Sequence, residues 1–245
     1  MKRLYSWKPG LADHRDRIFE SSASIPLFVN KLGTENPIED QGQLGSCTGN
    51  SSTSVVEIIC KVPQLSRLMA YYNGRLLEGT VRQDAGAEIK DVIKAISKYG
   101  IAKEQVWPYN VSKFKRKPTI KAYRDAASLI PKIKEYRKIP DLNSLKQSLA
   151  LGLPVVFGFS VPEYFESIDF DKNPYLILPS DTDKIIGGHA VAAVGYDDRD
   201  AHRKFIWVRN SWGKDWGLDG YFKMDQSWFT DNRMLVDDMW TVLPA

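Results

Sequence analysis

Cys47 is the side chain in this sequence best suited to act as a nucleophile. A helix is expected to begin here, where a thiolate would meet the positive end of the helix dipole and free backbone N–H groups. Gln41 precedes it in the segment DQGQLGSC (40–47), and its amide could donate a hydrogen bond to an oxyanion. Taken alone, a cysteine is more often a buried structural residue, so the assignment depends on its partners.

His189 and Asn210 are the candidate partners of Cys47. His189 follows two glycines in GGHAVAAVGY (187–196), whereas the other two histidines lie in charged, polar segments. Asn210 lies in WVRNSWGKDWG (207–217), where its amide oxygen could accept a hydrogen bond from the imidazole and fix the orientation of the ring. Trp212 could shield that bond from water.

Composition excludes several other classes of function. Two cysteines and three scattered histidines do not supply the ligands of a zinc site, so we expect no metal. With 34 basic and 30 acidic side chains, the net charge of +4 does not indicate a nucleic-acid partner. The longest nearly apolar run, residues 153–159, is too short to span a bilayer, so we expect no membrane partner.

The two cysteines and the N-terminus indicate the compartment. Cys47 and Cys60 are expected on one helix, about 20 Å apart, and therefore cannot form a disulfide. The first residues contain no apolar segment of the kind found in signal peptides. We therefore expect a cytoplasmic or other reducing compartment, with secretion by a route without a signal peptide left open.

The hydrophobic pattern predicts a helical half followed by a strand-rich half. Ser46 is the expected N-cap of the first helix, Pro63 ends it, and Gly100 ends the third. The expected helices are 47–61, 65–79, 87–99 and 142–151, and the expected strands are 25–29, 154–160, 189–196, 205–209 and 220–224.

In three separated segments, 41–47, 187–196 and 207–222, the sequence resembles the papain family of cysteine peptidases, which includes the cathepsins. His189 lies 142 residues after Cys47, within the spacing of about 130–150 that is typical of that family. Asn210 lies 163 residues after it, which an insertion at 169–184 would explain. Leu44 and Thr48 depart from the family pattern: the family has one half of a disulfide at the first position and an aromatic residue at the second.

The resemblance implies an α+β, papain-like fold with a helical left domain, a β-barrel-like right domain and a cleft between them. It implies an N-terminal arm over 1–22, a left domain over 23–132 and a right domain over 133–245. Cys47 would be the nucleophile, His189 its acid–base partner and Asn210 the orienting group, and Gln41 would contribute to the oxyanion hole. The implied substrate-binding residues are Gly86, Ala87, Gly188 and Trp212, and no cofactor is needed.

The implied activity is hydrolysis of peptide bonds in a peptide or protein substrate through a thiol acyl-enzyme, by an endopeptidase or another peptidase. Three alternatives remain: a ligase or other acyl-transfer enzyme on the same fold, a cell-wall amidase with a histidine in place of Asn210, and a non-catalytic peptide-binding module. The 46 residues before Cys47 exceed the need of the family by roughly twenty. The apolar side chains of this extra N-terminal segment must be buried somewhere. The simpler expectation is that the segment packs as a strap along the back of the right domain and stabilises it. The alternative is that it regulates access to the cleft by self-inhibition.

Overall fold

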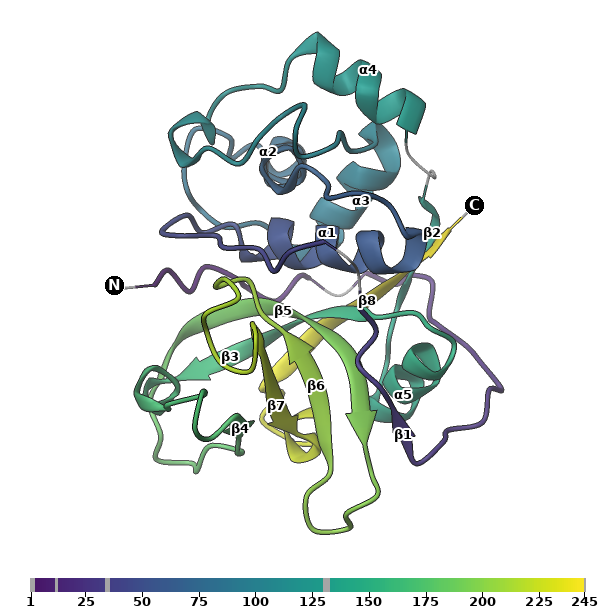
Figure 1. Cartoon of the computed structure of the whole chain (residues 1–245), viewed down its shortest axis with the longest axis vertical. Coiled ribbons are helices and arrows are strands. Elements are labelled where there is room, and N and C mark those ends of the chain that lie inside the picture. Colours follow the sequence, from purple (N-terminus) through teal and green to yellow (C-terminus); the bar gives the residue numbers. More distant parts are fainter. Residues whose placement is uncertain (1–2, 12, 34–35, 130–132, 245) are drawn as a thin grey trace.

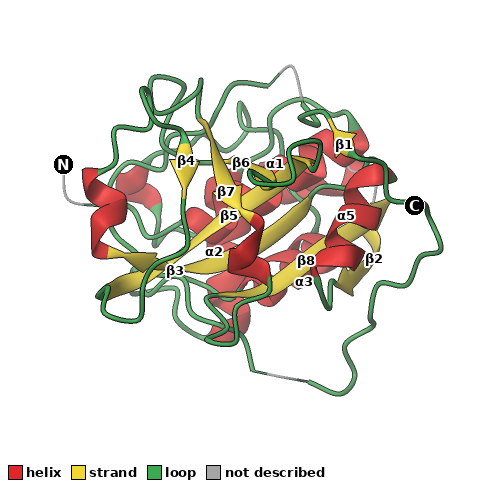
Figure 2. Cartoon of the chain, turned by 90° about the horizontal axis from the view of Figure 1, so that it is seen from below, coloured by secondary structure: helices red, strands yellow, loops and turns green. Residues whose placement is uncertain are grey.

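A computed structural model describes residues 3–11, 13–33, 36–129 and 133–244. A layer of helices packs against one side of a strongly bent sheet (Figure 1). A fifth helix, α5, packs against β3 and β5 (Figure 2). The helices are α1 (Cys47–Cys60), α2 (Arg67–Glu78), α3 (Ile89–Tyr99), α4 (Ile120–Leu129) and α5 (Leu142–Ala150), with short 3-10 turns at Val111–Lys113, Glu163–Ser167 and Gln226–Phe229.

Within the described residues, eight strands form one sheet in the order β2-β8-β3-β5-β6-β7-β4, and β1 pairs with β5 outside this path. The pairs are antiparallel except β4 with β7. The papain-like α+β fold is confirmed, although the sheet is open and no closed barrel forms. The strands are β1 (Phe28–Val29), β2 (Ile133–Lys138), β3 (Val155–Pro162), β4 (Tyr175–Leu176), β5 (Ile185–Asp197), β6 (Phe205–Arg209), β7 (Tyr221–Asp225) and β8 (Val236–Pro244).

Helix α1 is buried on all sides from Cys47 to Ile58, which explains its small and polar residues. A Cβ atom at Gly49 would lie 2.9 Å from the carbonyl oxygen of Arg67, so only glycine permits this approach of α1 to α2. On its other side α1 contacts β5. Strand β5 alternates between the two cores: Ala190 and Ala192 pack toward the helices, and Val191 packs into an aromatic core behind the sheet. This packing brings Cys47 next to the strand that carries His189.

Most elements expected from the sequence are present within a few residues of their predicted ends. Ser46 is the residue before α1 as predicted, but its side chain does not cap the helix and instead contacts Tyr109. The strand expected at 25–29 is reduced to the two residues of β1. Helix α4 and strands β2, β4 and β8 were not predicted. The domain limits at 22/23 and 132/133 stay predictions, and residues 130–132 lie outside the described residues.

The N-terminal arm follows two different surfaces. Residues 3–10 run between the helices and the sheet (Figure 1), and Ser6 forms a parallel bridge with Gly188 of β5. Further along, Ile18 bridges to Lys138 of β2, and Phe19 is buried in the aromatic core. The arm therefore both occupies the space between the layers and straps the sheet. Within the described residues, no helix combines the length and apolar character needed to cross a membrane.

A buried ionic cluster ties the loop before α1 to the sheet. The guanidinium of Arg209 pairs with the Glu39 carboxylate at 3.2 Å, and both side chains are almost completely buried. Arg209 also donates to the Pro37 carbonyl at 2.9 Å and to the Tyr221 hydroxyl at 2.9 Å. Burial raises the pKa of nearby Glu57 to about 8, with a further rise from the Glu39 charge. Arg209 therefore supplies the cation that this carboxylate-rich interior requires.

We predict that Arg209→Met lowers the free energy of unfolding by about 3–5 kcal/mol, because it leaves the Glu39 charge buried without a partner. Chemical denaturation would measure this change. Arg233→Met is the control, because Arg233 forms ion pairs with Asp231 and Asp181 at the surface and its loss should have only a small effect on the free energy of unfolding. Equal losses in the two variants would contradict a special role for the buried pair.

Candidate active site

His189 and Asn210 form the hydrogen bond that the sequence predicted. The distance between His189 Nε2 and Asn210 Oδ1 is 2.8 Å. Asn210 Oδ1 also accepts the backbone N–H of Ser211 at 2.9 Å, which fixes the amide with its oxygen toward the imidazole. His189 Nε2 must therefore carry the proton of a neutral ring. Within the described residues, His189 Nδ1 has no hydrogen-bond partner, so its lone pair is available to accept a proton.

Trp212 shields this hydrogen bond by stacking on the imidazole. The two ring centroids are 4.9 Å apart and the planes are inclined by 27°. Phe159 contacts the same imidazole in an edge arrangement at 5.9 Å. These aromatic rings and the arm exclude water from His189, which is fully buried. The geometry agrees with the shielding role expected for Trp212.

Cys47 is the first residue of α1 and is also fully buried. Its sulfur lies beside the backbone N–H of Ala190, the residue after His189, and beside the hydroxyl of Ser6 from the arm. Ser6 Oγ also donates to the Gly45 carbonyl at 2.9 Å. Both cysteines are free thiols. The fold therefore places the nucleophile candidate next to β5, and the arm covers it.

Gln41 is held by both layers. Its backbone N–H donates to the Ser211 carbonyl at 2.9 Å, and its side-chain oxygen accepts the Ser211 hydroxyl at 2.7 Å. Gln41 Nε2 donates to the Leu44 carbonyl at 3.0 Å, which leaves its second hydrogen for an oxyanion. The amide that the sequence assigned to the oxyanion hole is thus fixed in position before substrate arrives.

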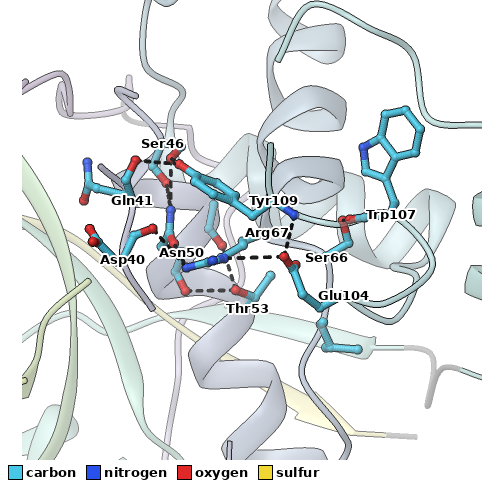
Figure 3. A network of polar contacts seen from close by, with 12 residues as sticks. Asp40, Gln41, Ser46, Asn50, Thr53, Ser66, Arg67, Glu104, Trp107 and Tyr109 are labelled. Carbon is cyan, nitrogen blue, oxygen red and sulfur yellow. Dashed lines mark hydrogen bonds and ion pairs between the residues drawn. The ribbon is translucent and has the colours of Figure 1, made fainter. Parts of the chain in front are cut away.

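A polar network behind α1 supports the loop that carries Gln41 (Figure 3). The Tyr109 hydroxyl donates to the Gln41 carbonyl at 2.8 Å and lies 2.6 Å from Ser46 Oγ. Arg67 stacks over the Tyr109 ring and donates to the carbonyl of Asp40 at 3.3 Å. The sequence gave no signal for this network, because its members are dispersed between residues 40 and 109.

Asp84 connects the loop before Cys47 to the rest of the helical layer. Its two carboxylate oxygens each lie 3.1 Å from the Gly45 backbone N–H, and one accepts the Tyr71 hydroxyl at 2.5 Å. The Gly86 N–H in turn donates to the Tyr71 oxygen at 3.2 Å. Leu44, adjacent to Gly45, replaces the cysteine that the resemblance led us to expect. Charge-assisted hydrogen bonds from Asp84 thus hold the residue next to the position where the family pattern has one half of a disulfide.

Three of the four predicted substrate-binding residues border the arm. A Cβ atom at Gly86 would lie 2.3 Å from the Ser6 carbonyl oxygen, and one at Gly188 would lie 2.4 Å from that of Trp7. Trp212 lies under the guanidinium of Arg3 at 3.9 Å. Ala87 instead packs into the core of the helical layer, and the assignment of all four residues stays a prediction. Sequence reasoning missed Asp84, because an isolated aspartate in a loop has no pattern to mark it.

The burial of Cys47 and His189 changes their acid–base properties. Burial raises the pKa of the Cys47 thiol, and the hydrogen bonds around it offset only part of that effect. Burial lowers the pKa of His189 to about 4, against the opposing effect of Asn210 and with a further decrease from the Arg3 charge. Both directions favour the neutral thiol and the neutral imidazole. Burial under the arm therefore disfavours a thiolate–imidazolium pair.

Within the described residues, no group of three or more histidine, cysteine, aspartate or glutamate side chains could hold a metal ion. The site itself offers a thiol, an imidazole, two carboxamides and backbone N–H groups. This set can transfer an acyl group through a thioester.

The chain resembles known proteins over most of its length. It is 39% identical over 219 residues to an uncharacterized peptidase C1-like protein of Acanthamoeba polyphaga mimivirus, covering 83% of this chain and 68% of the viral one. It is 27% identical over 194 residues to a cathepsin B-like protein of Giardia intestinalis, covering 76% of this chain and 63% of that protein. The chain therefore spans somewhat under two thirds of the second relative.

Solved structures support the same relationship. Xylellain, a cysteine protease from Xylella fastidiosa, superposes with a TM-score of 0.87 at 34% identity, covering 98% of this chain and 96% of that one. Digestive procathepsin L 3 of Tenebrio molitor shares the fold with a TM-score of 0.69 at 20% identity, covering 97% and 76%. The model of the papain family cysteine protease matches residues 30–238, so the chain belongs to the papain family of cysteine peptidases.

Proposed function

We propose that this chain hydrolyses peptide bonds with Cys47 as nucleophile and His189 as general base and acid. The 2.8 Å bond between His189 Nε2 and Asn210 Oδ1 is the observation that carries the proposal. It fixes the tautomer in which Nδ1 is free to take the thiol proton. Gln41 and the backbone N–H of Cys47 then stabilise the oxyanion.

The reaction begins when the proton of Cys47 Sγ moves to His189 Nδ1. The thiolate attacks the substrate carbonyl, and the carbonyl π electrons become an oxyanion that Gln41 Nε2 stabilises. As the C–N bond breaks, His189 returns its proton to the leaving amine, and a thioester remains on Cys47. His189 then takes a proton from water, which attacks the thioester and releases the acid and the thiol.

We predict that Cys47→Ala abolishes hydrolysis, because it removes the atom that forms the thioester. Asn210→Ala should lower kcat/KM about a hundredfold, because the imidazole loses the group that orients it. A fluorogenic peptide assay would measure both, in chains that also carry Arg3→Ala and Trp7→Ala so that substrate can reach Cys47. Cys60→Ala is the control and should retain full activity, because this thiol lies at the far end of α1. In a variant whose arm is released by Arg3→Ala and Trp7→Ala, labelling of Cys60 before Cys47 by iodoacetamide at limiting dose would contradict the assignment.

We also propose that arm residues 3–10 keep the enzyme latent. Three side chains anchor this segment: Arg3 stacks on Trp212, Tyr5 lies against His189 and donates to Glu166 at 3.0 Å, and Trp7 is 4% exposed. The Trp7 N–H donates to the Gly188 carbonyl at 3.0 Å. A substrate cannot reach Cys47 while these contacts persist.

The direction of the arm explains why the enzyme would not cleave it. The leaving amine must receive its proton from His189, so the C-terminal half of a substrate lies over His189 and Trp212. The N-terminal half then lies along Gly86 and Gly188. The arm runs in the opposite direction to such a substrate. Its N-terminal residues Arg3 and Tyr5 lie on the side of the leaving group, and Trp7, which follows them in the chain, lies on the acyl side. The Ser6 carbonyl points to Gly86 and does not enter the oxyanion hole.

We predict that Arg3→Ala combined with Trp7→Ala accelerates alkylation of Cys47 more than about tenfold, because buried arm contacts worth a few kcal/mol are lost. Mass spectrometry of the intact chain would follow the alkylation. Leu11→Ala is the control, since this arm residue is 87% exposed and should not affect the rate. Phe19→Ala should lower the melting temperature without accelerating alkylation, because this part of the arm is a strap. An unchanged rate in the double variant would contradict latency.

We predict that His189 is neutral at pH 6 in the full chain and protonates only near a pH of about 4. In the Arg3→Ala, Trp7→Ala variant, water and the Cys47 thiolate should keep the imidazole protonated at pH 6. Nitrogen NMR of the imidazole distinguishes the two forms. Because the proton comes from the thiol, opening takes up none from solvent, and the opened fraction should change little between about pH 5 and 7. A protonated His189 at pH 6 in the closed chain would contradict this account.

A further inference from the structure

Trp7 fills a pocket whose wall is built from glycine. A Cβ atom at Gly158 of β3 would lie 1.9 Å from the indole Cε2, and one at Gly188 of β5 would lie 2.7 Å from Cε3. Any larger residue at either position would displace the ring. When the arm leaves, these two strands therefore border a hollow large enough for a long side chain.

A buried carboxylate lies at the end of this hollow. Asp238 of β8 is 5% exposed, and one of its oxygens accepts the Trp240 indole N–H at 2.6 Å. Within the described residues, its other oxygen, Oδ2, has no hydrogen-bond partner of good geometry, and neither has Trp7 Nε1. Burial raises the pKa of Asp238, and the Trp240 and Trp7 indoles beside the carboxylate offset part of that rise. One carboxylate oxygen is thus available to a ligand in the pocket.

The backbone turns Asp238 into the pocket. The pairing of β3 with β8 shifts register between Val156, opposite Trp240, and Gly158, opposite Asp237. Strand β8 accommodates its extra residue with Asp238 at a φ of 56°, a backbone conformation that residues other than glycine rarely adopt. Irregularities of this kind often redirect a side chain at a functional site.

A second carboxylate borders the same space. A Cβ atom at Gly10, just after the Trp7 segment, would lie 3.1 Å from Glu88 Oε2 and 3.5 Å from Asp238 Oδ1. The nearby ammonium of Lys90 is engaged by two arm residues, Asp13 and Asp16. Asp237 and Asp91 add negative charge and Lys138 adds positive charge at the periphery. Two acidic groups therefore lie together beside Gly10, next to the segment that carries Trp7.

We propose that this pocket, once the arm has left, selects a cationic side chain, arginine or lysine, at the second residue on the acyl side of the scissile bond. The path of the arm indicates which substrate residue enters the pocket. Ser6 lies beside Cys47, where the first acyl-side residue of a substrate would lie, and the side chain of the next arm residue toward the acyl side, Trp7, enters the pocket. The chemistry follows from Asp238 Oδ2 and Glu88, whose negative charge a cation at the end of a long side chain would pair with. This inference rests on the proposed function and names its substrate class.

The test uses the full chain with Arg3→Ala and Trp7→Ala. Fluorogenic peptides would differ only at the second acyl-side residue, which is arginine, lysine, citrulline or leucine. Citrulline keeps the shape of arginine without its charge. We expect kcat/KM to be about tenfold to a hundredfold higher for arginine than for citrulline, the range of a charged hydrogen bond. Asp238→Asn should reduce this ratio to near one, Glu88→Gln should reduce it partly, and Asp238→Glu should preserve a preference for the cation.

Glu166→Gln is the matched control. It removes the same charge at the other end of the cleft, where Glu166 contacts Tyr5, so the ratio should stay unchanged. Equal rates for arginine and citrulline, or a preference for leucine, would overturn the inference. A ratio that survives Asp238→Asn in a folded variant would also overturn it. Alkylation of Cys47 by iodoacetamide keeps the two proposals distinct: a reactive thiol without hydrolysis of any peptide would contradict the proposed function instead.

Discussion

Cys47 belongs to a helix and His189 to a strand, so the two can react only where α1 packs on β5. This contact requires small residues along α1, because the helix is enclosed by α2 and the sheet at the same time. The buried pair of Arg209 with Glu39 and the bonds between Gln41 and Ser211 then fix the loop before α1 against the sheet. On the other side, Asp84 fixes the same loop to the helical wall of the cleft. The loop that carries Gln41, the proposed oxyanion donor, is therefore held from two sides without a disulfide.

Exclusion of water affects the site in two opposing ways, depending on whether the arm covers it (the closed state) or has left it (the open state). Removing water from a hydrogen bond such as that between His189 and Asn210 strengthens it and fixes the imidazole. Removing water from the thiol and the ring also disfavours their charged forms, and the closed site is desolvated enough for this effect to dominate. Trp212 shields only one face of the imidazole, whereas Tyr5 and Arg3 of the arm cover the space over the site. The same framework can thus serve both states, with the arm deciding which of them is present.

The sequence predicted the parts of this site that depend on residue type and short-range pattern. The sequence motifs around Cys47, His189, Asn210 and Gln41 are distinctive. Helix α3 shows a helical apolar periodicity because it buries one face, and strand β3 is an apolar run because it buries both faces. The path of the arm depends on contacts between residues far apart in the sequence, such as Ser6 with Gly188, for which no local signal exists. The side chain of Ser46 was assigned to capping, but the Tyr109 hydroxyl competes for it. Asp238 was not identified, because its role depends on a register shift between strands that pair across the fold.

The arm and a substrate would use the same walls with opposite chain directions. A side-chain pocket can be filled from a backbone of either direction, because the side chain enters roughly perpendicular to the backbone. The backbone is sensitive to it, because attack requires a carbonyl carbon over Cys47 with its oxygen toward Gln41, and the Ser6 carbonyl is turned to Gly86 instead. An inhibitory segment can therefore imitate the bulk of a substrate in the Trp7 pocket while withholding the reactive group. The inhibitory segment also need not carry the positive charge proposed for the substrate. The Trp7 indole fills the space beside Asp238 without pairing with its charge. A ligand that supplies a cation could therefore displace the arm.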